Sequence, residues 1–176
     1  MKNFIIHVFG IDRVGMTFDI SKEIKILNGN IETSRMIKLG QDFNMLILIS
    51  LNPEKINTLK EALNNYNDLS FTIKETSKEN INKENKFIFR LKGADNEGIV
   101  HYCTKLFSKL NINILDLETK IVNAPNTGSP LFYIKAILLI PDVNNIKNQL
   151  ESSIVNIESD KNVVIKFCQY DSTLNH

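Results

Sequence analysis

The chain has 176 residues, 43% of them apolar, which is enough for one ordinary domain or two small ones with a packed core. Its 21 Lys and Arg residues balance 20 Asp and Glu residues, which argues against a protein that binds DNA or a membrane surface through its overall charge. The two cysteines lack the spacing of a zinc site or redox pair, and no apolar run is long enough to cross a membrane, so we expect a soluble cytoplasmic protein with no metal and no cofactor.

The first elements are a predicted strand and a predicted helix. The strand covers the apolar run 4–9 and ends at Gly10. The helix that follows has an apolar stripe at helical spacing, made of Met16, Ile20, Ile24 and Leu27. Asn28 and Gly29 should end this helix, because both residue types accept the left-handed conformation of a helix C-terminus.

Two strands, a helix and a last strand complete the first half. A tight reversal at 39–42 separates the second strand from the third, which covers 43–51 and is apolar on both faces. Such a strand is central in its sheet. A second helix begins at Asn52-Pro53, and the last strand covers 69–74. The apolar stripe of this helix consists of Ile56, Leu59, Leu63 and Tyr66.

The second half of the chain repeats the first at an offset of 83 residues. Ten of the 28 positions in 4–31 are identical in 87–114, and they include the Gly, Asp and Asn residues that set the turns. The same reading gives strands at 87–91, 131–140 and 163–167, with helices starting near Ile99 and after Asp142. The order β-α-β-β-α-β predicts the ferredoxin-like fold, an antiparallel four-stranded sheet with both helices on one face. The fold class is therefore α+β with two such modules.

A polar segment separates the two copies. Ile81 is its only apolar residue between 74 and 86, which is typical of a solvated linker. We expect module 1 at 1–75, a linker at 76–85, module 2 at 86–170 and a C-terminal tail at 171–176. Because helices cover only one face of each sheet, we also expect the copies to pack together and the chain to form a homodimer.

The turn after the first strand of each copy is the candidate ligand site. It has the pattern D-x-x-G, with Asp12 and Gly15 in copy one and Asp95 and Gly98 in copy two. Backbone N–H groups at a helix N-terminus favour a carboxylate or a phosphate, and the Asp beside them could accept an ammonium group. An α-amino acid would satisfy both. The alternative is that each Asp caps its helix and each Gly supplies an unusual backbone angle.

Two βαββαβ copies with D-x-x-G turns and an Asn-Ile pair opening strand two resemble tandem ACT domains, which are amino-acid-sensing regulatory modules. With the segment 124–132 between strands of the second copy, the chain is similar to the glycine cleavage system transcriptional repressor family. The resemblance implies a small amino acid effector such as glycine, a regulatory protein partner and no enzymatic activity. It implies these ligand-binding residues: Asp12, Arg13, Val14, Gly15, Asn30, Asp95, Asn96, Glu97, Gly98 and Asn113.

The sequence departs from this family at the turns. Members often have D-R-P-G, whereas Val14 and Glu97 stand in place of the proline and Asn96 in place of the arginine. The charge of Glu97 would repel a carboxylate, so the second turn is the weaker candidate. Asn30, directly after Asn28-Gly29, is also interpretable as a turn residue.

Three other functions stay open at this stage. The first is an ACT-like protein-interaction module without a ligand. The second is RNA binding, because ferredoxin-like sheets also occur in RNA-recognition modules, although neither third strand has the aromatic and basic pattern those modules use. The third is an enzyme, although the sequence shows no nucleophile with a matching base and no paired catalytic carboxylates.

Two further features carry expectations. The segment 123–130 is rich in Pro and Gly and is interpretable as a hairpin extension or as a docking loop. Cys103 falls on the helical stripe and Cys168 ends the last strand, so both are expected to be buried.

Overall fold

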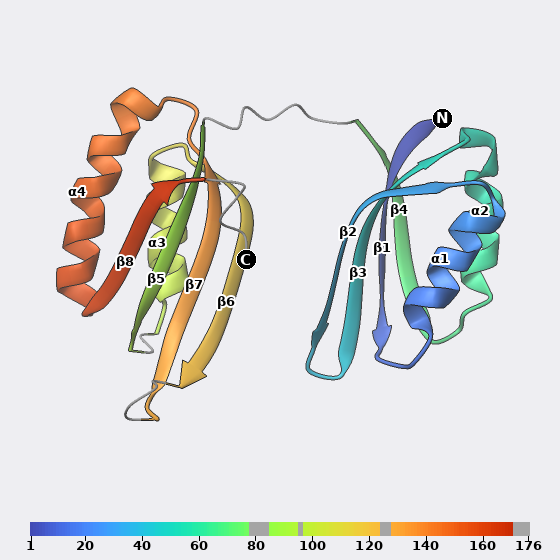
Figure 1. The fold of residues 1–176 in the computed structure, drawn as a ribbon, viewed down its shortest axis with the longest axis horizontal. Coiled ribbons are helices and arrows are strands. Elements are labelled where there is room, and N and C mark those ends of the chain that lie inside the picture. Colours follow the sequence, from blue (N-terminus) through green and yellow to red (C-terminus); the bar gives the residue numbers. More distant parts are fainter. Residues whose placement is uncertain (78–84, 95–96, 124–127, 171–176) are drawn as a thin grey trace. The chain divides into compact units, whose positions relative to one another are not determined.

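The computed structural model describes residues 1–77, 85–94, 97–123 and 128–170 (Figure 1). The chain divides into two compact units, Met1–Asn80 and Ile81–His176. Each unit has its own hydrophobic core, and each is described separately below. None of the helices in the described ranges is both long enough and apolar enough to span a membrane.

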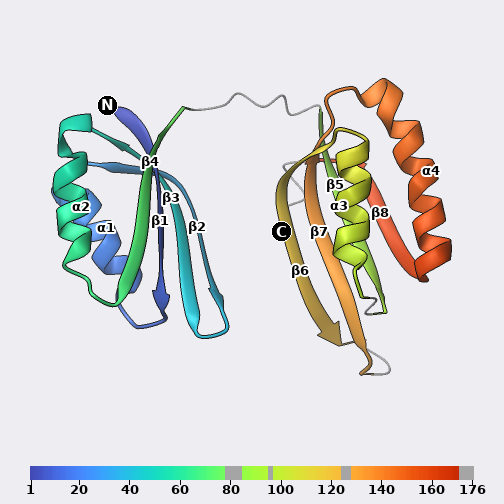
Figure 2. The ribbon, with the colours of Figure 1, turned by 180° about the vertical axis from the view of Figure 1, so that it is seen from behind.

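The first unit is a four-stranded antiparallel sheet with two helices on one face (Figures 1 and 2). The strands lie in the order β2-β3-β1-β4, so the apolar third strand is central, as predicted. Its elements are β1 (Lys2–Ile11), α1 (Met16–Ile26), β2 (Asn30–Leu39), β3 (Asp42–Leu51), the 3-10 helix η1 (Pro53–Lys55), α2 (Ile56–Asn64) and β4 (Leu69–Thr76).

The second unit repeats this topology with the strand order β6-β7-β5-β8. Its elements are β5 (Lys86–Ala94), α3 (Ile99–Lys109), β6 (Asn113–Asn123), β7 (Pro130–Leu139), α4 (Val143–Lys161) and β8 (Val163–Gln169). The predicted fold class, two ferredoxin-like α+β modules, is confirmed. The offset of 83 residues relates α1 to α3 residue for residue, and it relates the first residues of β2 and β6.

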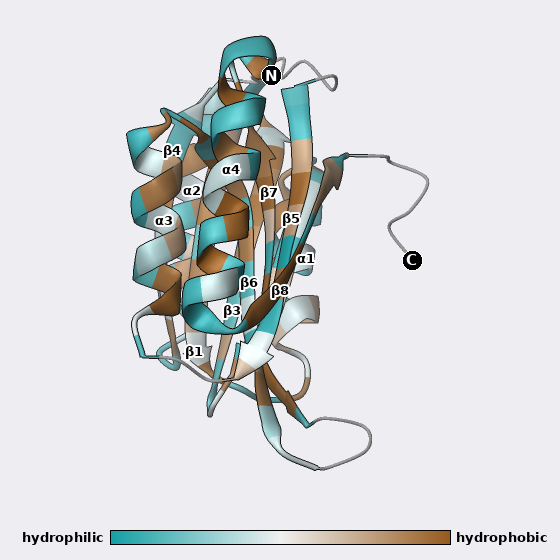
Figure 3. Cartoon of the chain, turned by 90° about the vertical axis from the view of Figure 1, so that its left-hand side faces the viewer, coloured by the Kyte–Doolittle hydropathy of each residue, from teal (hydrophilic) through white to brown (hydrophobic). Residues whose placement is uncertain are grey.

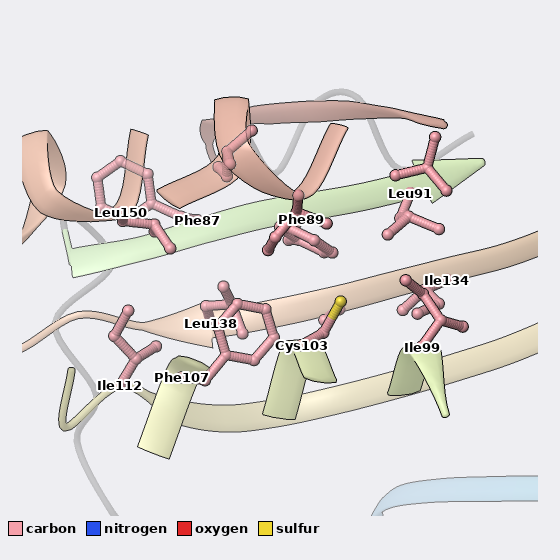
Figure 4. Close-up of a cluster of buried hydrophobic side chains, with 14 of the residues drawn as sticks. Phe87, Phe89, Leu91, Ile99, Cys103, Phe107, Ile112, Ile134, Leu138 and Leu150 are labelled. Carbon is pink, nitrogen blue, oxygen red and sulfur yellow. The ribbon is translucent and has the colours of Figure 1, made fainter. Parts of the chain in front are cut away.

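The core of each unit lies between the sheet and its helices, where the brown apolar residues of Figure 3 gather. In the second unit, the ring of Phe107 on α3 meets the ring of Phe89 on β5 edge-on, with centroids 5.1 Å apart and planes at 84° (Figure 4). Both side chains are almost completely buried. Aromatic pairs prefer this edge-to-face geometry, so the pair fixes α3 against the sheet.

The helix ends follow the sequence signals. Asn28 and Asn111 have φ angles of 57° and 52°, the left-handed conformation that ends a helix. At the start of η1, the side chain of Asn52 accepts a hydrogen bond from the backbone N–H of Glu54 at 3.2 Å. Asp142 caps α4 in the same way. Tyr66 lies beyond the C-terminus of α2, so it is not part of that helix as the stripe had predicted.

The prediction that the first strand ends at Gly10 is wrong, and the first strand of the second copy likewise extends beyond the predicted 87–91. β1 continues to Ile11 and β5 to Ala94. A Cβ atom at Gly10 would lie 2.5 Å from the carbonyl oxygen of Asp68, and one at Gly93 would lie 2.5 Å from Cγ1 of Val163. Glycine is therefore required here for the close approach of the neighbouring edge strand, and not to break the strand.

The prediction for the cysteines is half right. Cys103 is buried in the core of the second unit, but Cys168 is exposed. Along β8 the side chains alternate, with Val163 buried and Val164 exposed. Cys168 is in register with the exposed positions of this strand, on the face that no helix covers.

Candidate functional site

The turn between β1 and α1 lies at the end of the first sheet where the β2–β3 reversal also lies (Figure 1). The backbone N–H of Asp12 donates to the carbonyl oxygen of Gln41 in that reversal at 2.9 Å. Gly15, with a φ of 91°, precedes α1, and no side chain caps this helix. The first N–H groups of α1 thus lack the side-chain acceptor that usually satisfies them, and N–H groups of this kind can donate to an anion.

The carboxylate of Asp12 lies beside this helix start and does not cap it. Its Oδ2 accepts a hydrogen bond from Nζ of Lys38 on β2 at 2.8 Å, and the side chain is 32% exposed. The alternative interpretation of Asp12 as a helix cap is therefore wrong for the first copy. Asp12 is oriented by β2, and it is accessible to a cation at the mouth of the turn.

Arg13 connects the turn to two other elements. Its Nη1 lies 2.8 Å from Oδ2 of Asp19 on α1, and its Nε donates to Oδ2 of Asp68, the residue before β4. The hydrogen bonds to Asp68 and then to Asp19 raise the pKa of Arg13, and the bond from Arg13 lowers the pKa of Asp68. Two carboxylates thus neutralise Arg13, which braces the turn and does not present a free positive charge.

Large apolar side chains surround this turn in solvent. Val14 is fully exposed, and Ile11, Phe18 and Leu39 are each more than 60% exposed. Ile11 and Leu39 both pair with Asp42 on β3, which puts them at the same end of the sheet. Exposed apolar groups gathered at one site indicate a surface that another protein surface covers.

The start of α3 resembles the start of α1 in backbone and differs from it in charge. Gly98 has a φ of 77° and precedes α3, which also has no side-chain cap. Glu97 is exposed where Val14 stands in the first copy. Asp95 and Asn96 lie outside the described residues. The backbone condition for an anion site is therefore met in both turns, but Glu97 opposes an anion at the second.

The two predicted asparagines lie far from these turns within their own modules. Asn30 opens β2 and pairs with Ser50 near the end of β3, whereas the turn adjoins the start of β3. Its Nδ2 donates to Oε1 of Glu32 at 3.2 Å. Asn113 holds the equivalent place in β6 and borders a hollow of about 420 Å³ at the C-terminus of α3. The structure brings Asp12, Arg13, Val14 and Gly15 together, but in neither module does it bring the asparagine to the turn.

The bracing partners of the turn were not found from the sequence. Lys38, Asp19 and Asp68 are 26, 6 and 55 residues away from the turn residues that they contact. Asp19 lies in the first turn of α1, where acidic residues are common because they interact favourably with the helix dipole, so no sequence pattern connected it with Arg13. Nothing in the local pattern singled out Lys38 or Asp68. Among the residues that the structure describes, no group of three or more His, Cys, Asp or Glu side chains could hold a metal ion.

Comparisons with known proteins address the family and the fold of the chain. Residues 2–74 match the model of the ACT domain. The glycine cleavage system transcriptional repressor of Escherichia coli (strain K12) is 23% identical over 175 residues, covering 95% of this chain and 92% of that protein.

Two solved structures match along nearly the whole chain. An unknown protein from Galdieria sulphuraria is 29% identical with a TM-score of 0.84, covering 97% of this chain and 99% of that one. A candidate glycine cleavage system transcriptional repressor is 21% identical with a TM-score of 0.67, covering 96% and 98%. The latter likeness concerns the fold. Residues 2–74 therefore form an ACT domain, and the chain as a whole is a tandem of ACT-like modules that resembles the glycine cleavage system transcriptional repressors.

Proposed function

We propose that this chain is an amino-acid-responsive regulatory protein whose effector binds at the turn between β1 and α1. The observation that carries the proposal is the uncapped start of α1 beside the carboxylate of Asp12. The helix N–H groups favour the carboxylate of an α-amino acid, and Asp12 favours its ammonium group. Glycine is the first effector to test, because the named relative is a glycine cleavage system repressor.

A complete site requires a second module. Asn30 and the Asp12 turn lie at opposite ends of one sheet, so a single small ligand cannot contact both within a module. An asparagine from a second copy of the chain is needed to complete the contact. The exposed side chains of Ile11, Val14 and Leu39 give such a module an apolar surface to cover. We propose a homodimer on this ground.

The regulatory effect is proposed to pass through a protein partner. A ligand shifts an equilibrium only by its different affinity for two states, so effector binding has to change module packing or the surface that the partner contacts. The near-neutral chain lacks the overall positive charge of a typical DNA-binding domain. In an electrophoretic mobility assay, binding of the purified chain alone to promoter DNA at sub-micromolar concentration would contradict this step.

The experiment is calorimetric titration of the full chain with glycine, with serine and with a pool of other amino acids. We expect saturable heat for at least one of them, lost in Asp12→Asn and kept in Glu54→Gln. Both variants remove one carboxylate charge, and Glu54 lies on η1, away from the turn. Equal heats for the two variants would contradict the assigned site.

A second candidate function is a protein-interaction module without a ligand. Two observations favour it: Arg13 is neutralised by two carboxylates, and Asp12 is already paired with Lys38. In that case no amino acid gives heat, and the turns serve the fold alone. The same titration therefore separates the two functions.

A further inference from the structure

The face of the second sheet that lies opposite its helices carries a cluster of positive charges. On β5 the side chains of Phe87, Phe89 and Leu91 enter the core under the helices. Because side chains alternate along a strand, Arg90 and Lys92 emerge on the opposite face, which no helix of this unit covers.

The strand register extends this cluster across the sheet. Arg90 lies directly opposite Lys135 on β7 and directly opposite Lys166 on β8. Neighbouring strands are about 4.8 Å apart, so three cations stand side by side in one row. Like charges in directly opposed positions destabilise a sheet. Within the described ranges, none of Arg90, Lys92, Lys135 and Lys166 has an ion-pair partner.

A hollow lies among these side chains. It has a volume of about 330 Å³ and is lined by Arg90, Leu91, Lys92, Tyr133, Val164 and Lys166. None of its lining residues is acidic. The nearby carboxylate of Glu118 on β6 pairs with Lys120, and Nζ of Lys120 lies 5.1 Å from the ring centroid of Tyr133. The mostly apolar walls of the hollow thus include the side chains of three cationic residues, whose aliphatic stems line it, and an aromatic ring stands at its edge.

The first sheet shows that the fold does not require this cluster. The positions equivalent to Lys166, Arg90 and Lys135 hold Thr72, His7 and Leu46, which pair in the same register. The first helix starts and ends alike in the two copies, but on this face of the sheet the copies differ. A destabilising row of cations that is present in one copy alone indicates a role outside folding.

We propose that this face of the second sheet binds a small organic molecule that carries a phosphate group, held by Arg90, Lys92 and Lys166 with Tyr133 beside it. A phosphate monoester carries a charge of about −1.5 to −2 at neutral pH, which matches several unpaired cations better than a single carboxylate does. Arg90, at the centre of the row, can donate two parallel hydrogen bonds to phosphate oxygens. The volume of the hollow is within the range of small-molecule sites.

A small molecule fits this surface better than a nucleic acid strand. The cluster reaches from the edge strand β8 to β7, and on the other edge strand, β6, Glu118 pairs with Lys135 in the row that contains Arg90. A polyanionic strand leaving the hollow in that direction would meet this carboxylate. The overall charge of +1 also gives a polymer little long-range attraction.

The test is calorimetric titration of the full chain with adenosine monophosphate, with inorganic phosphate and with a single-stranded oligonucleotide of mixed sequence. We expect saturable binding of adenosine monophosphate that weakens as salt increases. In Arg90→Gln the affinity should fall about tenfold or more, the effect of losing charge-assisted hydrogen bonds. Lys74→Gln removes a charge from the exposed side of β4 and should bind like the unchanged protein.

A thermal melt supplies an independent readout. Because Arg90 stands between two lysines, Arg90→Gln should raise the melting temperature while it weakens binding, a combination that general damage to the fold does not produce. The proposal is overturned by no binding of either phosphate probe, by equal binding in the two variants, or by binding of the oligonucleotide alone. Because the β1–α1 turn is a separate site, Arg90→Gln should leave any glycine heat unchanged.

Discussion

Replacing Phe107 with alanine should destabilise the second unit while leaving the first unit intact. Phe107 is 1% exposed and contacts Phe89 edge-on with centroids 5.1 Å apart. Removing a buried phenylalanine reduces the free energy of unfolding by about 3–5 kcal/mol, and losing an aromatic pair accounts for about 1 kcal/mol of that. The cores of the two units share no residue, so the loss should stay in one of them.

Urea unfolding of the full chain, combined with hydrogen exchange resolved by segment, measures this effect. Exchange should accelerate in β5 and β7 and stay unchanged in β1 and β3. The control is Phe18→Ala, which removes the same group from a position that is 67% exposed and should change stability by no more than about 0.5 kcal/mol. A loss below about 1 kcal/mol for Phe107→Ala, or equal acceleration in both units, would refute the reasoning.

Three further outcomes are expected. Gly15→Val should lower the free energy of unfolding by about 1–2 kcal/mol, because valine resists the φ of 91° at this position, and an unchanged urea midpoint would contradict it. Arg13 lowers the pKa of Asp68, so this pair stabilises the fold at pH values above the unfolded pKa of an aspartate, and the contribution is lost as the pH falls through the folded pKa. In Arg13→Gln the free energy of unfolding should therefore fall less steeply as the solution is made acidic. An identical acid side of the two stability curves would refute the pairing. Burial raises the pKa of Cys103 to about 11, so iodoacetamide at pH 8 should alkylate exposed Cys168 first, and equal rates would count against the packing.

The repeat and the helix ends were predictable because they depend on local chemistry. Asn28 and Asn111 adopt the left-handed conformation that their residue type permits, and the offset of 83 residues places both. The central position of β3 was predictable because its sequence is apolar on both faces, which is typical of a strand that lies between two other strands of a sheet. These features were read correctly from short stretches of sequence.

What the sequence left open depends on contacts between distant residues. Arg13 was predicted as a ligand-binding residue, but Asp68, which neutralises it, is 55 residues further along the chain. Asn30 was predicted to help hold the ligand, and the direction of β2, which no local pattern reveals, places it at the end of the sheet opposite the turn of its own module. The positive face of the second sheet depends on the register of three strands, which no single segment of sequence reveals.

The close packing at Gly10 and Gly93 affects how modules of this kind are identified from their sequences. A side chain at Gly10 would collide with Asp68, the residue before β4, and a side chain at Gly93 would collide with Val163, the first residue of β8. Selection for a stable sheet is therefore sufficient to keep the glycine, whether or not the following turn binds anything. A search pattern built on this glycine finds modules with the right architecture, including those that have lost their effector. The residues that indicate whether a module binds an effector are those of the turn after this glycine, and in that turn the two copies of this chain differ in sequence.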